Sequence, residues 1–273
     1  VYSPIIDKGE ADFIVSFEKL EAARYVEYLR PEGRIVVNTQ EIDPMPVITG
    51  AAQYPESLIE KMEAWQKENY EAIIVVTCSA DLSGTNNGFH LAKDTVGLDN
   101  VYIYDSRQVG APVMDMAIRA KQLADEGKDV DEIFKVLEEK TKHSFSFLYP
   151  DNFDQLSRSG RLSPMAARMA SMLKIKALLC LDEQGKSVDK YSMSRTEVKV
   201  LKAITDKFHE LGVNAEKYKI YISHADNIVF AKKAKLLLQT TFHGIEVEIN
   251  NLPAVLTCHG GLACCALHST YKI

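Results

Sequence analysis

The sequence predicts a two-domain α/β protein, with a parallel-sheet α/β domain over residues 1–148 and a second α/β domain over residues 149–273. Two observations support this class. In the first half, short strand-like runs alternate with longer helical ones, which is typical of parallel α/β units. After about residue 148 the strand-like runs lie closer together, and a turn at residues 183–185 indicates a hairpin. The second domain is therefore expected to have a mixed or antiparallel sheet.

The elements of the first half follow from apolar periodicity. Apolar residues between positions 20 and 29 fall on one helical face, whereas residues 72–77 are rich in β-branched residues, as in a strand buried on both faces of a parallel sheet. Pro44 and Pro46 exclude regular structure after the second strand. The expected strands are residues 12–17, 34–38, 72–77 and 101–104, and the expected helices are residues 19–29, 56–68, 84–95, 114–126 and 131–141.

The same patterns define the elements of the second half. Fewer residues separate its strand-like runs, and two long helical patterns lie between them. The expected strands are residues 177–182, 186–192, 218–224 and 244–250, and the expected helices are residues 152–156, 163–173, 195–211 and 228–240.

Composition excludes several function classes. A net charge of −6 gives no basic face for nucleic acid. The longest apolar runs are too short to cross a bilayer, so we expect no stable membrane insertion, and the opening residues show no signal-peptide pattern. The five cysteines lack CxxC spacing, which favours reduced thiols in the cytoplasm over disulfides, zinc or iron–sulfur clusters. We expect no metal and no cofactor.

The first candidate site is the end of the predicted strand 72–77. Ser79, Ser83 and Thr85 supply hydroxyls there, and Gly84 lets a ligand approach the backbone at the start of the next helix. Helix-start amides attract anions, and in open α/β sheets ligands bind beyond the carboxyl ends of strands. A phosphate-loop lysine is absent, which argues against a nucleoside triphosphate. The alternative is that Ser83 only caps its own helix.

Two further segments have a binding and a structural interpretation. Residues 165–173 are rich in alanine and methionine, and because methionine adapts its shape this helix face could hold a flexible apolar ligand or be ordinary core. His259, expected at a strand end beside Gly260 and Gly261, could donate to an anion that the glycines admit, or could serve a structural role.

Several motifs resemble the DegV family, whose members bind fatty acids and present acyl chains to a fatty acid kinase. The resemblance covers about residues 65–273, and the motifs occur in the family's order. They are Ser79-Ala-Asp-Leu-Ser-Gly-Thr85, Tyr104-Asp-Ser-Arg107, Phe153-Asp-Gln-Leu-Ser-Arg-Ser-Gly-Arg-Leu162, Leu173-Lys-Ile-Lys176, Ser194-Arg-Thr196, His224-Ala-Asp-Asn227 and His259-Gly-Gly261.

The resemblance implies a binding protein rather than an enzyme, with a long-chain fatty acid between two domains. It implies that a C-terminal strand returns to the ligand cleft, and that a fatty acid kinase catalytic subunit is a partner. By the same resemblance the carboxylate is held by Ser79 or Ser83, by Thr49 and by His259, and Arg195 lies near the kinase-facing surface. The remaining ligand-binding candidates are Gly84, Thr85, Arg161, Met169, Gly260 and Gly261. The chain departs from the family pattern at Ala263, a usual glycine, and after Thr49.

Residues 1–57 carry a second resemblance. Residues 1–6, 9–13, 31–38 and 49–55 resemble the beta subunit of indolepyruvate oxidoreductase, a 2-oxoacid:ferredoxin oxidoreductase. The alternative function is therefore a subunit or fragment of such an enzyme. A third class, a hydrolase using Ser83 and His259, lacks both the G-x-S-x-G elbow and an identifiable acidic partner.

Overall fold

The computed structural model describes residues 9, 11–16, 28–37, 70–151, 154–158, 160–163, 166, 175–182 and 184–273. The chain divides into two compact units, Val1–Trp65 and Gln66–Ile273. Each unit is described by itself.

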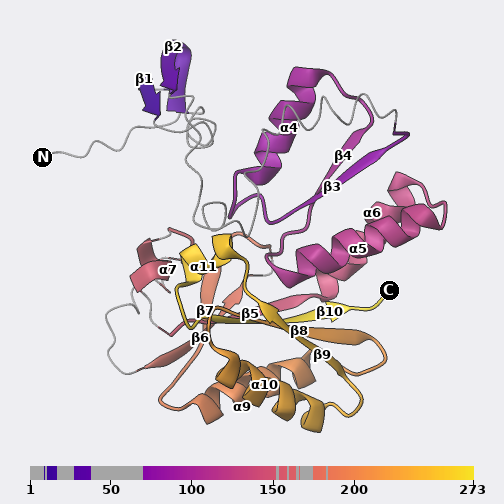
Figure 1. Cartoon of the computed structure of the whole chain (residues 1–273), viewed down its shortest axis with the longest axis vertical. Coiled ribbons are helices and arrows are strands. Elements are labelled where there is room, and N and C mark those ends of the chain that lie inside the picture. The colour runs from indigo at the N-terminus through magenta and orange to yellow at the C-terminus, as the bar shows by residue number, and fades with distance from the viewer. Residues whose placement is uncertain are drawn as a thin grey trace, which may run out of the picture. The chain divides into compact units, whose positions relative to one another are not determined.

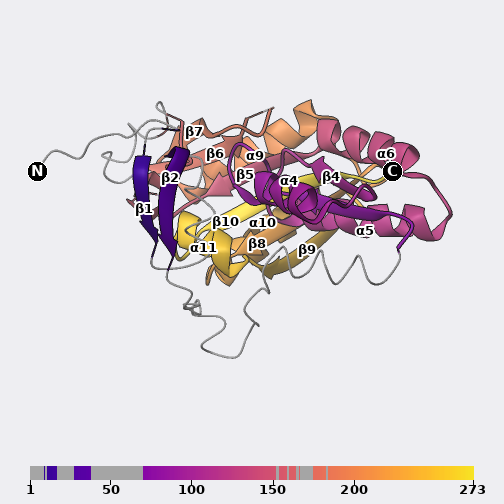
Figure 2. The same cartoon turned by 90° about the horizontal axis from the view of Figure 1, so that it is seen from above.

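The first unit contains a parallel pair of strands (Figure 2). β1 (Ala11–Ser16) confirms the strand predicted at residues 12–17, and β2 (Leu29–Val37) contains most of the second. The predicted helix over residues 19–29 is wrong at its last residue, because Leu29 opens β2 in register with Ala11. Most of that helix, and the helix predicted at residues 56–68, lie outside the described residues.

The second unit opens with a small parallel α/β layer. β3 (Ile73–Thr77) pairs in parallel with β4 (Val101–Asp105), and α4 (Thr85–Val96) connects them. α5 (Ala111–Asp125) and α6 (Val130–His143) follow. These elements confirm the predicted ones, except that α5 begins three residues early, because Pro112 fits the first helical turn. α6 begins with a capping box between Asp129 and Glu132.

A six-stranded mixed sheet forms the larger part of the second unit (Figure 1). Its strand order is β7-β6-β5-β10-β8-β9, with β8 and β9 parallel and the other pairs antiparallel. Its strands are β5 (Phe145–Tyr149), β6 (Lys176–Leu181), β7 (Val188–Ser194), β8 (Tyr218–His224), β9 (Glu246–Asn251) and β10 (Cys265–Tyr271). The predicted α/β class with a mixed sheet and the hairpin at residues 183–185 are thereby confirmed.

The main core lies between this sheet and two helices, α9 (Glu197–Glu210) and α10 (Ile228–Thr241). Figure 1 shows both helices on one side of the sheet, while α5 and α6 lie on the other. The sheet face toward α9 and α10 is apolar. Its largest fully buried side chains, with those of the two helices, are Phe147, Leu178, Ile204, Phe208, Ile220, Ile222 and Phe230.

Three segments differ from the predictions. Neither β5 nor the range of β10 was predicted, and His259 does not stand at a strand end: it lies in the last turn of a short helix, α11 (Ala254–Gly260). The helix begins after Pro253, whose carbonyl accepts from Thr257 N at 2.9 Å. The other short helix, α7 (Asp154–Arg158), lies two residues later than predicted. The boundary at residue 148 stays a prediction.

Most of the helix predicted at residues 163–173 lies outside the described residues. Among the helices that the structure does describe, none combines the length and apolar character needed to span a membrane.

Candidate functional site

The loop between β3 and α4 holds the first group of predicted site residues. Ser79 is 1% exposed, and its Oγ donates to the carbonyl of Gly185 at 2.5 Å. Its backbone N donates to Gln108 O at 2.9 Å. Its own carbonyl accepts from Ser83 N at 3.1 Å. Ser79 therefore ties the loop both to the β6–β7 turn and to the loop after β4.

The N-terminus of α4 lacks a side-chain cap. Gly84 is the N-cap residue, and no acidic residue lies in the first turn. Ser83 Oγ lies 2.9 Å from Thr85 Oγ1 and accepts from Thr85 N at 3.3 Å. Gly84 and Thr85 are exposed. Thr85 N and one of the two hydroxyl hydrogens are used in these bonds, so the later amides of the first turn and the other hydroxyl hydrogen form the group of donors at this exposed helix end that suits an anion.

The segment 160–163 connects this loop to the large sheet. Arg161 Nε donates to Leu82 O at 3.4 Å, and Arg161 O accepts from Val188 N at 3.0 Å. Leu82 packs against an apolar cluster that includes Leu156, Leu179 and Leu181. Because Leu82 directly precedes Ser83, the proposed anion-binding end of α4 lies next to aliphatic side chains.

His259 lies on α11, which contacts α7 (Figure 1). Gln155 Nε2 of α7 donates to Cys258 O at 2.6 Å. A Cβ at Gly261 (φ +83°) would lie 3.4 Å from Gln155 Cβ. A Cβ at Gly260 would meet Cys264 Sγ at 2.9 Å, so the chain is packed closely there.

The predicted residues are thus only partly brought together. Ser79, Ser83, Gly84 and Thr85 share one loop, and Arg161 contacts that loop. The residues on both sides of His259 contact α7, which lies a few residues before Arg161 in the chain. The exposed Arg195 follows β7 and precedes α9. Thr49 and Met169 lie outside the described residues.

Apolar residues where β8 and β9 end and β10 begins form a second cluster. Ala225, Leu252, Cys264 and Ala266 are buried, and Leu148 and Leu256 pack against them. Leu148 also packs against the cluster that contains Leu82. Leucine side chains therefore connect the loop before α4 with the base of α11.

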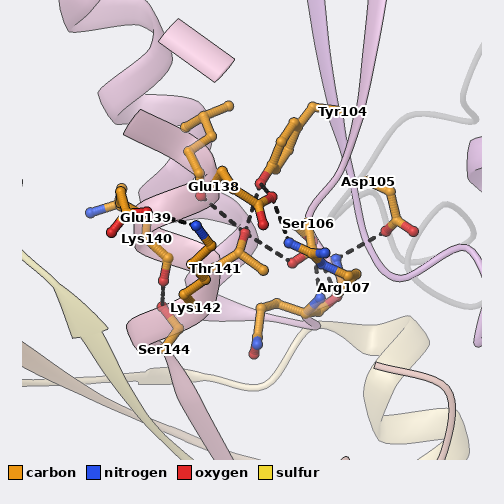
Figure 3. A network of polar contacts seen from close by, with 12 residues as sticks. Tyr104, Asp105, Ser106, Arg107, Glu138, Glu139, Lys140, Thr141, Lys142 and Ser144 are labelled. Carbon is orange, nitrogen blue, oxygen red and sulfur yellow. Dashed lines mark hydrogen bonds and ion pairs between the residues drawn. The ribbon is translucent and has the colours of Figure 1, made fainter. Parts of the chain in front are cut away.

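The motif Tyr104–Arg107, to which the sequence gave no role, takes part in a polar network beside this loop (Figure 3). Arg107 Nη2 and Glu138 Oε2 lie 2.6 Å apart, and Tyr104 OH donates to the same carboxylate at 3.2 Å. Burial raises the pKa of Tyr104 to about 12, so the phenol keeps its proton. Asp105 Oδ1 accepts from Arg107 N at 2.9 Å and from Ala80 N at 3.2 Å. The loops after β3 and β4 therefore share one carboxylate.

A buried histidine, for which the sequence favoured a structural role, lies close to this network. His268 on β10 is 1% exposed, and its Nδ1 lies 2.8 Å from Ser146 Oγ, which donates to Gln108 Oε1 at 3.0 Å. Burial lowers the pKa of His268 to about 4, so the imidazole is neutral at pH 7. Among the residues that the structure describes, none is a hydrogen-bond partner of its Nε2. Ser146 uses its one hydrogen on Gln108, which assigns the His268 proton to Nδ1.

Metal-ion ligands do not gather in this part of the molecule. Across the described ranges, no three His, Cys, Asp or Glu side chains come together as a metal site.

Comparison with known proteins gives relatives of similar length and fold. The fatty acid-binding protein of Thermotoga maritima is 27% identical over 199 residues, which cover 72% of this chain and 68% of that protein. The solved fatty acid binding DegV family protein of Streptococcus agalactiae matches with a TM-score of 0.73 at 20% identity, covering 96% of this chain and 98% of that one. A DegV family protein of Eubacterium eligens, solved loaded with heptadecanoic acid, has a TM-score of 0.70 at 17% identity, covering 95% and 100%.

A family model described as "Uncharacterised protein, DegV family" matches residues 44–272. It begins within the segment that resembles an oxidoreductase subunit, and these comparisons give that second resemblance no support. The match covers most of the chain, in the same residues whose loops and strands form the site described above. The chain belongs to the DegV family.

Proposed function

We propose that this protein binds a long-chain fatty acid, with the carboxylate at the N-terminus of α4. The observation that carries the proposal is family membership over residues 44–272, together with relatives of the same fold that are described as fatty acid binding. The local geometry supports it, because the end of α4 offers donors and the residue just before them, Leu82, joins an apolar cluster.

The head group is held by donors that carry no net charge of their own. The anion is assigned to the amides at the start of α4 and to the one hydroxyl hydrogen that the Ser83–Thr85 bond does not use, and the helix dipole adds a partial positive charge. We assign His259, which is followed by Gly260 and Gly261, as a further donor. Hydrogen bonds to a carboxylate are stronger than neutral ones, which offsets the desolvation of the head group.

The tail is held by aliphatic side chains. Leu82 and Leu148 share one cluster, and Leu148 and Leu256 share the next, so the tail is assigned along this row. Burying about 15 methylene groups at about 0.8 kcal/mol each contributes a gross stabilisation of about 12 kcal/mol, before the costs of ordering the ligand.

The protein acts as a carrier rather than as a catalyst. In the described part of the loop, Ser79 bonds a backbone carbonyl and Ser83 bonds the hydroxyl of Thr85. We propose that a fatty acid kinase receives the ligand and that the exposed Arg195 lies on the contacting surface. The five cysteines are free thiols, which supports placement in the cytoplasm.

The experiment compares two ligands that differ only in the head group. Palmitate and hexadecanol are titrated into the purified, delipidated protein by calorimetry. We expect palmitate to bind with 1:1 stoichiometry and more tightly than hexadecanol. Replacing both head-group hydroxyls, as Ser83→Ala with Thr85→Val, removes most of that preference. A protein that binds neither ligand contradicts the proposal, and so does a variant that keeps the full preference.

A further inference from the structure

The turn between β6 and β7 contacts the loop that carries the proposed anion site. Ser79 Oγ donates to Gly185 O although 106 residues separate the two. A hydroxyl has one hydrogen, so in this arrangement Ser79 Oγ offers only lone pairs to any other group. A carboxylate accepts hydrogen bonds, and Ser79 has no hydrogen left to donate to it. Ser79 therefore holds the loop in place but is not a donor to the ligand.

Gly185 lies directly on the loop after β4. A Cβ at this position would stand 2.5 Å from Arg107 O and 2.9 Å from Arg107 Cα, and Gly185 has φ +73°. Both the space and the backbone conformation require glycine. Arg107 cannot easily move away from a Cβ at position 185, because Glu138 binds its guanidinium group and Asp105 accepts from its backbone amide (Figure 3).

The turn is stiff in itself. The Asp182 carboxylate accepts from the amides of Gln184, Lys186 and Ser187 at 2.8, 3.0 and 2.7 Å, and from Ser187 Oγ at 2.9 Å. Burial opposes ionisation of this carboxyl, but the hydrogen bonds outweigh burial and lower the pKa of Asp182. These hydrogen bonds hold the turn in one conformation and so fix the position of Gly185 relative to Ser79.

We propose that the β6–β7 turn, through its described residues 182 and 184–187, positions the anion site at the N-terminus of α4, with Gly185 and Ser79 as positioning residues rather than ligands. The inference rests on the proposed function and deepens it. A displacement of Ser79 also displaces the backbone of the anion site, because Ser79 O accepts from Leu82 N at 3.2 Å and from Ser83 N at 3.1 Å. Selectivity for a carboxylate then depends on a turn that does not touch the ligand.

The first test displaces the turn with Gly185→Ala. Gly127→Ala is the matched control, because Gly127 also has positive φ (+80°) but a Cβ there meets nothing within 4 Å. The preference for palmitate over hexadecanol is measured for both variants. We expect it to fall by roughly ten-fold or more in Gly185→Ala, the size of one misplaced hydrogen bond to a charged group, and to stay unchanged in Gly127→Ala.

The second test is a double-mutant cycle between Ser79→Ala and Gly185→Ala. If Ser79 acts only through the turn, Ser79→Ala lowers the palmitate preference in the wild-type background and has no further effect in Gly185→Ala. If Ser79→Ala instead lowers the palmitate preference by the same factor in both backgrounds, Ser79 acts as a ligand and the inference is overturned. Where Gly185→Ala does not fold, the cycle uses Ser187→Ala, which removes one hydrogen bond to Asp182.

The two proposals fail in different ways. An unchanged palmitate preference in Gly185→Ala, or an equal loss in Gly127→Ala, overturns the positioning role while wild-type binding still supports the function. A wild-type protein that binds neither palmitate nor hexadecanol overturns both.

Discussion

His268 makes the stability of this protein depend on pH. In the folded protein burial lowers the pKa of His268 to about 4, whereas the unfolded chain has the ordinary value near 6.5. Above pH 6.5 the imidazole is neutral in both states and its contribution is fully present. As the pH falls from about 6.5 to about 4, the unfolded state takes up a proton that the folded state refuses, and stability is lost.

The size of the loss follows from the shift in pKa. A pKa difference of about 2.5 at about 1.4 kcal/mol for each pH unit amounts to about 3.5 kcal/mol when complete. Because the folded His268 is itself half protonated at pH 4, the loss between pH 7 and pH 4 is about 3 kcal/mol. The assay is urea unfolding at several pH values, for wild type and for His268→Gln, which stays neutral and keeps a partner for Ser146. We expect the free energy of unfolding of the variant to fall by about 3 kcal/mol less over this range. The control is His243→Gln, at an exposed position. Equal pH slopes in wild type and His268→Gln would refute the reasoning.

Three further variants test the packing and the polar contacts. Phe230→Ala empties a site in the core beside Tyr149, and chemical denaturation is expected to show a loss of about 3–5 kcal/mol; a loss below about 1 kcal/mol would contradict the assigned core. Lys140→Met leaves the carboxylate of Asp115 without its 2.7 Å ion pair, at a cost of about 3–5 kcal/mol, and adding Asp115→Leu is expected to recover part of it. Asp129→Ala removes the capping box of α6 and is expected to cost about 1 kcal/mol, with no effect on palmitate affinity.

The sequence predicted the elements whose patterns are regular. β8 is apolar through most of its length, and α9 and α10 show apolar residues at helical spacing, so their bounds were found to within two residues. The Ser79–Thr85 loop was recognised because hydroxyls and a glycine follow a buried strand. Each of these signals depends only on residues that are close in sequence, and so does the secondary structure that it predicts.

The elements that were missed depend on distant partners. A C-terminal strand was expected but not its bounds, because β10 carries the polar residues His268, Ser269 and Thr270 in buried positions, where β5 and β8 pair with it and helices pack on the sheet. α11 has seven residues and ends in two glycines, so its pattern does not distinguish a helix from a strand end. The contact between Ser79 and Gly185 joins residues 106 apart, and no spacing rule shows it.

Native mass spectrometry tests the central claim most directly. The protein is purified without detergent, delipidated, and incubated with a mixture of palmitate and hexadecanol. We expect a species heavier than the chain by one palmitate, and we expect this species to be absent from the spectrum of the Ser83→Ala, Thr85→Val variant. A spectrum with only the unliganded chain, or with hexadecanol bound as readily as palmitate, would contradict it.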